Sequence, residues 1–367
     1  MPRDSLSPAP ARGTTVEVHD HPSRTVSTVS TSAQVANEPN GRQLSLDGLR
    51  IALFSGNYNM VVDGANKALN RLVEYLLRNG AKVRVYSATI EHPAFEPQGD
   101  LISLPSLALP KRGEYRMSLG LSARVRRDLD RFAPNVVHIS SPDFAARAAV
   151  RWARARDIPV LASVHTRFET YARYYHIGFL EPVVESWLRV MYRRCDALVT
   201  PSQGMVDVLR AQRMNDDISL WERGVDRQVF NSGRRDLAWR RAQGIADGEV
   251  VIGFLGRLVM EKGLGAFADT IAELRRRRVP HKVLVVGKGP AREWFEERLP
   301  GAVFTGFQEG ADLARSIAAM DVLFNPSVTE TFGNVTLEAM ACGVPVAAAR
   351  ATGSTSLVAD GVNGTLV

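Results

Sequence analysis

The chain has 367 residues, which exceeds the usual size of one hydrophobic core and favours two α/β domains. Apolar residues make up 45% and charged residues 23%, as in ordinary globular proteins, and no run of about 18 apolar residues is long enough to span a membrane. Most of the net charge of +7 lies in residues 47–228, but no nucleic-acid-binding motif accompanies it, so we expect no nucleic-acid partner.

The N-terminal segment, residues 1–46, is rich in Ser, Thr, Pro and Ala and lacks apolar periodicity, which predicts a disordered tail. It contains no apolar stretch of the kind found in a secretory signal. The two cysteines, Cys195 and Cys342, lie far apart in apolar segments, which favours buried thiols in a reducing compartment over a disulfide. We therefore expect a cytoplasmic location, which includes the inner face of the membrane.

Short apolar runs of strand type alternate with longer helical patterns from Leu49 onward. In the first half the predicted strands are 49–54, 82–86, 135–139, 159–163 and 196–200, with helices such as 64–79 and 181–194. The pattern weakens across 213–248, and 223–248 is the predicted linker. It then resumes with strands at 250–255, 282–286, 302–305, 321–325 and 345–349, and with helices at 263–278, 290–298, 310–319 and 334–342.

This alternation predicts two doubly wound, Rossmann-like α/β domains, 47–228 and 229–367, each with a parallel sheet covered on both faces. Ligands of such sheets bind at the carboxyl ends of the strands, so we expect a cleft between two facing domains. The last residues, 364–367, are typical of the start of another strand, and we expect further elements to follow them.

The first candidate site is Gly256-Arg-Leu-Val-Met-Glu-Lys-Gly263, between a strand and a helix. Amides at a helix N-terminus carry partial positive charge, and Arg257 and Lys262 add two cations, so the segment is suited to a diphosphate. The alternative is an ordinary connecting loop.

The second candidate is Thr329-Glu-Thr-Phe-Gly-Asn-Val-Thr-Leu-Glu-Ala-Met340, after the strand 321–325. Carboxylates repel phosphate but accept hydrogen bonds from sugar hydroxyls, which suits Glu330 and Glu338. Gly333 allows close backbone approach at a helix start. The alternative is that both glutamates are surface charges, but the presence of the Gly256 segment at the same sheet edge favours a joint site.

Two features of the first half complete the predicted site. His165 follows the strand 159–163 and would face the cleft, although a lone histidine is more often structural, and Asp63-Gly64 opens a helix whose amides would point the same way. No G-x-G-x-x-G follows the first strand, which argues against a nicotinamide enzyme. Gly287-Lys-Gly289 is interpreted as a common turn. No zinc-ligand spacing and no D-x-D signature is present, so we expect no metal.

These residues, in this order, resemble glycosyltransferase family 4. Glu330 to Glu338 is similar to its E-x7-E signature, Gly256 to Lys262 to its G-R-x-x-x-x-K segment, and Gly224-Val-Asp226 to its interdomain G-V-D. The resemblance covers about 47–367. It implies a GT-B architecture and an enzyme that transfers a hexose from a nucleotide-diphosphate sugar with retention of configuration and without a metal or other cofactor.

The resemblance also implies a role for each matching residue. Arg257 and Lys262 would hold the diphosphate, Glu330 the donor-sugar hydroxyls, and Glu338 the ribose. Contacts to sugar and phosphate would come from His165, Gly64, Phe332, Gly333 and Asn334, and contacts to the base from Gly306, Phe307 and Gln308.

Finer detail comes from His165 to Tyr175 and from Trp221 to Asp226. Both stretches are similar to GDP-mannose-dependent α-mannosyltransferases acting on lipids and to bacterial enzymes that glycosylate diacylglycerol from UDP-sugars. We expect a lipid or glycan acceptor, with GDP-mannose favoured as donor. The basic stretch Lys111–Arg131 is either a solvated helix face or a contact with anionic lipid. A non-catalytic protein that binds nucleotide sugars or membranes is the alternative function. Family members usually end in a helix that crosses back onto the first domain, and the resemblance implies that closure of the two domains depends on it.

Overall fold

A computed structural model describes residues 45–61, 63–109, 112–170 and 178–367. Most of the predicted disordered tail, residues 1–44, lies outside these ranges, and so does Lys111 at the start of the basic stretch. Within the described ranges no helix is both long and apolar enough to cross a bilayer.

The first half of the fold is built on a parallel sheet. Within the described residues this sheet has seven strands in the order β3-β2-β1-β6-β7-β8-β9. The strands are β1 (Arg50–Ser55), β2 (Lys82–Ser87), β3 (Asp100–Ser103), β6 (Val136–Ile139), β7 (Val160–Ser163), β8 (Ala197–Thr200) and β9 (Ile218–Leu220). A separate antiparallel pair joins β4 (Ser106–Leu109) to β5 (Arg112–Ser118).

A second parallel sheet forms the other half. Its six strands within the described residues have the order β12-β11-β10-β13-β14-β15. They are β10 (Val251–Leu255), β11 (Lys282–Val286), β12 (Val303–Gly306), β13 (Val322–Asn325), β14 (Val346–Ala348) and β15 (Gly364–Leu366). In both sheets the strand order reverses next to the first strand, beside β6 in one and β13 in the other. Such a reversal opens a crevice at the carboxyl ends of the two neighbouring strands, where ligands bind.

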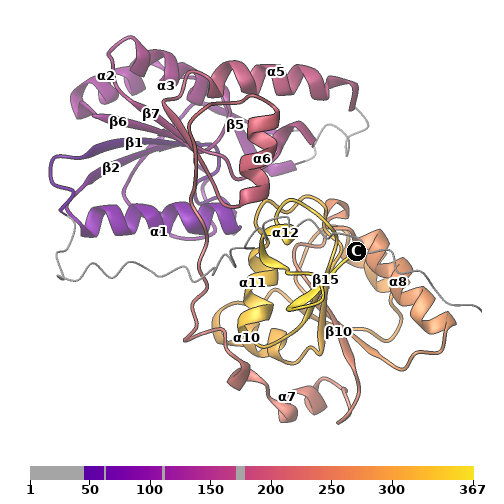
Figure 1. The fold of residues 1–367 in the computed structure, drawn as a ribbon. Helices are drawn as coiled ribbons and strands as arrows, with labels where there is room; N and C mark the ends of the chain where they lie inside the picture. Colours follow the sequence, from indigo (N-terminus) through magenta and orange to yellow (C-terminus); the bar gives the residue numbers. More distant parts are fainter. Residues whose placement is uncertain (1–44, 62, 110–111, 171–177) are drawn as a thin grey trace, which may run out of the picture. The chain divides into compact units, whose positions relative to one another are not determined.

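Helices connect the strands of both sheets (Figure 1). In the first half they are α1 (Gly64–Arg78), α2 (Ala123–Phe132), α3 (Phe144–Arg154), α5 (Glu181–Tyr192) and α6 (Gln203–Ala211). In the second they are α7 (Leu237–Ala242), α8 (Leu264–Arg276), α9 (Arg292–Arg298), α10 (Gly310–Ala318), α11 (Asn334–Ala341) and α12 (Ser354–Leu357). Several begin at an Asp or Ser whose side chain accepts from a backbone N–H of the first turn, as Asp63 does for α1 and Ser202 for α6.

Each sheet is packed between apolar clusters. Strand β1 buries side chains on both faces, as expected for a central parallel strand. In the second half, Phe254, Phe267 and Phe295 contact one another edge to face at ring-centroid distances of 5.4–5.6 Å. Cys195 and Cys342 are buried free thiols, as predicted.

The sequence predicted two Rossmann-like sheets and most of their strands to within about a residue, and both predictions are confirmed. The final residues do form a strand, β15, paired with β14 at the sheet edge. The predicted linker 223–248 contains the short helix α7, whose buried Arg240 donates to the carbonyl of Ala319. The exact division at residues 228 and 229 stays a prediction.

Candidate functional site

Two loops of the second half lie side by side because they follow the adjacent strands β10 and β13. The first runs over 256–263 and the second over 326–333. Gly263 has φ +76°, and a Cβ there would lie 2.7 Å from the carbonyl oxygen of Pro326, so the loops touch where only glycine fits. Thr329 Oγ1 also donates to the carbonyl of Glu261 at 3.3 Å.

An ion pair joins these loops at the predicted site. Lys262 Nζ lies 2.6 Å from Glu330 Oε1, and the two side chains are 29% and 16% exposed. Lys262 was predicted to hold phosphate and Glu330 to hold sugar hydroxyls, but contact between the two side chains was not predicted. The pairing places a cation and a hydroxyl acceptor within one hydrogen bond of each other, as a phosphate-linked sugar would require.

The backbone of the second loop contacts Gly353, the residue before α12. The N–H of Gly353 donates to the carbonyl of Glu330 at 2.8 Å, and a Cβ on Gly353 would lie 2.6 Å from the nitrogen of Phe332. Gly333, with φ +94°, then starts α11 without a side-chain cap. The first amides of α11 are therefore available to an anion from Asn334 onward.

Glu338 lies one turn further along α11 and is partly buried. Burial raises the pKa of its carboxyl, and the positive charges of Lys67 and Arg71 offset part of this rise. The resulting pKa is about 7. Those two cations lie on α1, a helix of the first half, so the face of α11 that carries Glu338 is turned toward α1. Neither cation was predicted as part of the site.

The N-terminus of α1 approaches the start of α11. A Cβ on Gly64 would lie 2.2 Å from Asn334 Nδ2, which explains glycine at this position. Burial raises the pKa of the neighbouring Asp63, opposed by its bonds to the α1 amides and by the charges of Arg257 and Lys262. Residues predicted separately on the two halves are thus brought together.

His165, at the carboxyl end of β7, is tied to the same loop. Thr331 Oγ1 donates to the carbonyl of His165 at 2.7 Å, and Ser202 Oγ donates to the carbonyl of Thr331 at 2.6 Å. The imidazole is 9% exposed, and burial together with the charge of Arg223 holds its pKa well below the usual range. His165 is therefore neutral at physiological pH.

A third loop reaches the site through glycine packing. A Cβ on Gly287 would lie 1.9 Å from the carbonyl oxygen of Gly256, and one on Gly289 would lie 2.4 Å from that of Leu258. The N–H of Gly287 donates to the carbonyl of Gly306 at 2.8 Å. The sequence marked Gly287-Lys-Gly289 only as a common turn, and the structure adds that both glycines pack against the 256–263 loop.

The predicted base-binding residues follow this third loop. Phe307 is exposed, with the Lys288 ammonium 4.9 Å from its ring centroid, and Gln308 Nε2 donates to the carbonyl of Thr305. The exposed ring is a surface on which a base could stack. Its assignment to the base stays a prediction.

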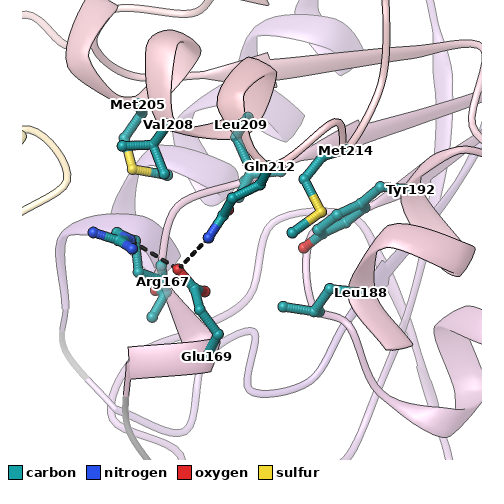
Figure 2. Close-up of a pocket in the computed structure, with 11 residues that line it drawn as sticks. Arg167, Glu169, Leu188, Tyr192, Met205, Val208, Leu209, Gln212 and Met214 are labelled. Atoms are coloured by element: carbon teal, nitrogen blue, oxygen red, sulfur yellow. Dashed lines mark hydrogen bonds and ion pairs between the residues drawn. The ribbon is translucent and has the colours of Figure 1, made fainter. Parts of the chain in front are cut away.

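A separate pocket, lined in part by residues of α5 and α6, holds none of the predicted site residues (Figure 2). There Arg167 Nε donates to the buried Glu169 carboxylate at 2.8 Å, and apolar side chains of α5 and α6 form most of the remaining lining.

The described residues also bear on metal binding. Over residues 45–61, 63–109, 112–170 and 178–367, no cluster of three His, Cys, Asp or Glu side chains is arranged to bind a metal ion. Independence of metal stays a prediction.

Comparison with known proteins agrees with the motifs. Residues 62–229 match the profile "Glycosyltransferase Family 4" and residues 249–367 match "Glycosyl transferases group 1". A GDP-mannose-dependent alpha-mannosyltransferase of Mycolicibacterium smegmatis is 33% identical over 87% of this chain and 84% of its own length. The chain belongs to glycosyltransferase family 4.

Other relatives of this glycosyltransferase widen the range of chemistry. A second GDP-mannose-dependent alpha-mannosyltransferase, from Corynebacterium glutamicum, is 30% identical over 87% of the chain and 76% of its own length. An alpha-monoglucosyldiacylglycerol synthase of Streptococcus pneumoniae is 24% identical over 87% and 75%. Among solved structures, sucrose-phosphate synthase from Thermosynechococcus elongatus matches with a TM-score of 0.67 at 20% identity, covering 87% of this chain and 86% of the other. The fold is thus that of the GT-B glycosyltransferases.

The basic stretch of this glycosyltransferase divides into two parts. Arg116 is engaged internally, because its guanidinium donates to both oxygens of Ser106. On α2, by contrast, several arginines are exposed to solvent: Arg124, Arg126, Arg127 and Arg131. Among the arginines of this stretch whose exposure the structure describes, those of α2 are therefore the ones that could contact an anionic surface.

Proposed function

We propose that this glycosyltransferase transfers a hexose, with mannose from GDP-mannose favoured, to a lipid or glycan acceptor with retention of configuration. The observation that carries the proposal is the convergence of the Lys262–Glu330 pair, the α11 N-terminus, Gly64 and His165. The cations and amides would bind the diphosphate of a nucleotide-diphosphate sugar, and the carboxylate would accept hydrogen bonds from its sugar hydroxyls.

The diphosphate would lie over the α11 N-terminus, between Arg257 and Lys262. When the sugar–phosphate bond breaks, negative charge develops on the departing diphosphate. Fixed cations and amides stabilise that charge without reorganising, so electrostatic stabilisation would supply the largest share of the catalysis. In a retaining reaction of this kind the leaving diphosphate can itself accept the proton of the attacking hydroxyl, because both lie on the same face of the sugar.

The carboxylates would fix the two sugars of the donor. Glu330, held beside Lys262, would accept hydrogen bonds from hydroxyls of the transferred hexose. Glu338 would accept from the ribose hydroxyls, on the side of α11 that faces Lys67 and Arg71. Gly64 has no side chain to obstruct the phosphates, and a Cβ there would displace the side-chain amide of Asn334.

The choice of donor rests on the relatives. Two that are at least 30% identical carry the name GDP-mannose-dependent alpha-mannosyltransferase, which favours GDP-mannose. The similarity to an alpha-monoglucosyldiacylglycerol synthase supports a second candidate, a diacylglycerol glycosyltransferase that uses a UDP-sugar. The name of the second relative includes diacylglycerol, which supports a lipid acceptor. The arginines of α2 would then meet anionic headgroups at the inner face of a membrane.

A donor screen followed by a turnover assay tests the proposal. Thermal unfolding is measured with equal concentrations of GDP, UDP and ADP, since a nucleotide that binds the native state raises the apparent midpoint according to its affinity. We expect the largest rise with GDP. The matching nucleotide sugar is then supplied with a lipid extract, and glycolipid is detected by mass spectrometry.

Two outcomes would redirect the assignment. A larger rise with UDP would favour the diacylglycerol glycosyltransferase. Nucleotide binding without release of nucleoside diphosphate from the matching nucleotide sugar would instead indicate a non-catalytic binding protein.

A further inference from the structure

Arg223 makes an unusual contact with the site histidine. Its Nη2 lies 2.7 Å from His165 Nδ1, although the two residues are 58 positions apart. A guanidinium only donates hydrogen bonds, so the Nδ1 atom must accept. An imidazole that accepts at Nδ1 and is neutral carries its proton on Nε2.

The remaining nitrogen of the ring is a buried donor. Within the described part of the chain, His165 Nε2 is buried and has no hydrogen-bond partner. Buried polar atoms are nearly always paired, so an unpartnered N–H beside a ligand site is a candidate contact to the ligand. The carbonyl of the same residue is held by Thr331, next to Glu330, which puts the histidine beside the loop proposed to bind the sugar.

Arg223 is itself held in place. Its guanidinium lies 4.3 Å from the ring centroid of Trp221, and the Trp221 ring meets the His165 ring at a centroid distance of 5.4 Å. Burial lowers the pKa of Arg223 to about 10, so it remains charged at neutral pH. Arg223 and His138 are the ionisable groups that act on His165, and both oppose its protonation.

From this arrangement we propose that Arg223 is a positioning residue that fixes His165 as a neutral Nε2–H donor directed at a hydroxyl or ring oxygen of the donor sugar. The proposal rests on the proposed function for the identity of that ligand. The charge of Arg223 serves the same end, because a protonated imidazole would put a second cation beside a sugar that becomes oxocarbenium-like during transfer. In the sequence Trp221-Glu-Arg223 before Gly224-Val-Asp226, Trp221 would hold Arg223 in place and Arg223 would orient His165.

The tautomer can be measured without any activity. In protein labelled with ¹⁵N-histidine, long-range proton–nitrogen correlation distinguishes a protonated nitrogen from an unprotonated one, and His165→Asn assigns the signal among the seven histidines. We expect protonated Nε2 and unprotonated Nδ1, with no titration across the pH range in which the protein stays folded. In Arg223→Met, the His165 imidazole should be a mixture of tautomers and should titrate at a higher pH than in the wild type. Arg223→Lys, which keeps a charged donor, should restore the single tautomer.

Activity supplies the second reading. Arg223→Met should lower kcat by about 10- to 100-fold, by analogy with the loss when the hydrogen-bond partner that orients a metal-bound histidine is removed. The loss of activity in Arg223→Met should be greatest at low pH, where His165 becomes protonated, and GDP binding should be unchanged. Arg227→Met, at an exposed arginine of the same segment, is the matched control and should leave both readings at the wild-type level.

The two proposals fail separately. Protonated Nδ1 in the wild type, or an unchanged tautomer and titration in a folded Arg223→Met, would overturn the role of Arg223. The expected tautomer in a wild-type protein that transfers no sugar would leave that orientation standing and would overturn the proposed function instead.

Discussion

Replacement of Glu338 by Gln should stabilise the protein and weaken nucleotide binding at the same time. Glu338 has an ordinary pKa of 4.5 when the chain is unfolded, and burial raises it to about 7 in the folded chain. Below pH 4.5 both states are protonated and the group costs nothing. As pH rises from 4.5 to 7 the unfolded state loses its proton first, so the free energy of unfolding falls, and above pH 7 the full cost is present.

The magnitude follows from the same values. One pKa unit corresponds to about 1.4 kcal/mol, so ionised Glu338 costs up to about 3 kcal/mol, and its partial exposure reduces this to about 1–3 kcal/mol. Glutamine has the shape of the protonated acid and never ionises. Glu338→Gln should therefore raise the melting temperature by about 3–6 °C at pH 8 and by much less at pH 5.

Differential scanning calorimetry across this pH range is the assay, with exposed Glu297→Gln on α9 as the matched control. Glu297→Gln should leave the pH dependence unchanged. The rise in melting temperature caused by GDP should shrink in Glu338→Gln, because an amide oxygen is a weaker acceptor for ribose hydroxyls than a carboxylate. An equal melting shift at pH 5 and pH 8, or undiminished stabilisation by GDP, would refute the reasoning.

Three further changes probe other parts of the site. Gly64→Ala should leave thermal stability near the wild-type value, because the added methyl displaces only the flexible amide of Asn334, but should weaken GDP binding measured by calorimetry; unchanged affinity would remove Gly64 from the site. Lys262→Met leaves the Glu330 carboxylate without its cation, so we expect turnover to fall by about 100-fold and stability by about 1–2 kcal/mol, and wild-type kinetics would contradict this. The double charge reversal Arg127→Glu with Arg131→Glu should reduce sedimentation with anionic vesicles and leave GDP binding intact; equal sedimentation would separate α2 from any membrane contact.

The regular part of the fold could be predicted because parallel strands buried on both faces read as apolar runs. β1, β7 and β10 are of this kind. Strand β3, the hairpin of β4 and β5, and the short strand β9 were not predicted, because they mix polar with apolar residues. Strength of the local pattern, and not distance from the site, separated the elements that were predicted from those that were missed.

The site was predictable as a set of loops but not as a set of contacts. Glycines and charges after each strand marked the loops that the fold brings together. The pairing of Lys262 with Glu330 joins residues 68 positions apart, and that of Thr331 with His165 joins residues 166 apart. No local periodicity reports such partners, because they are set by the order of strands in each sheet and by the packing of the loops. Arg223 was overlooked as a site residue for the same reason.

The most direct test of the account is transfer by Glu330→Ala. With GDP-mannose and a lipid extract, the wild type should release GDP and form a mannosylated product. Glu330→Ala should fold, as judged by circular dichroism, and should lose at least about 100-fold in rate, since it removes a group proposed to act on the transferred sugar. Glu297→Ala should keep the wild-type rate. Wild-type turnover in Glu330→Ala would contradict the assignment of this segment as the donor site.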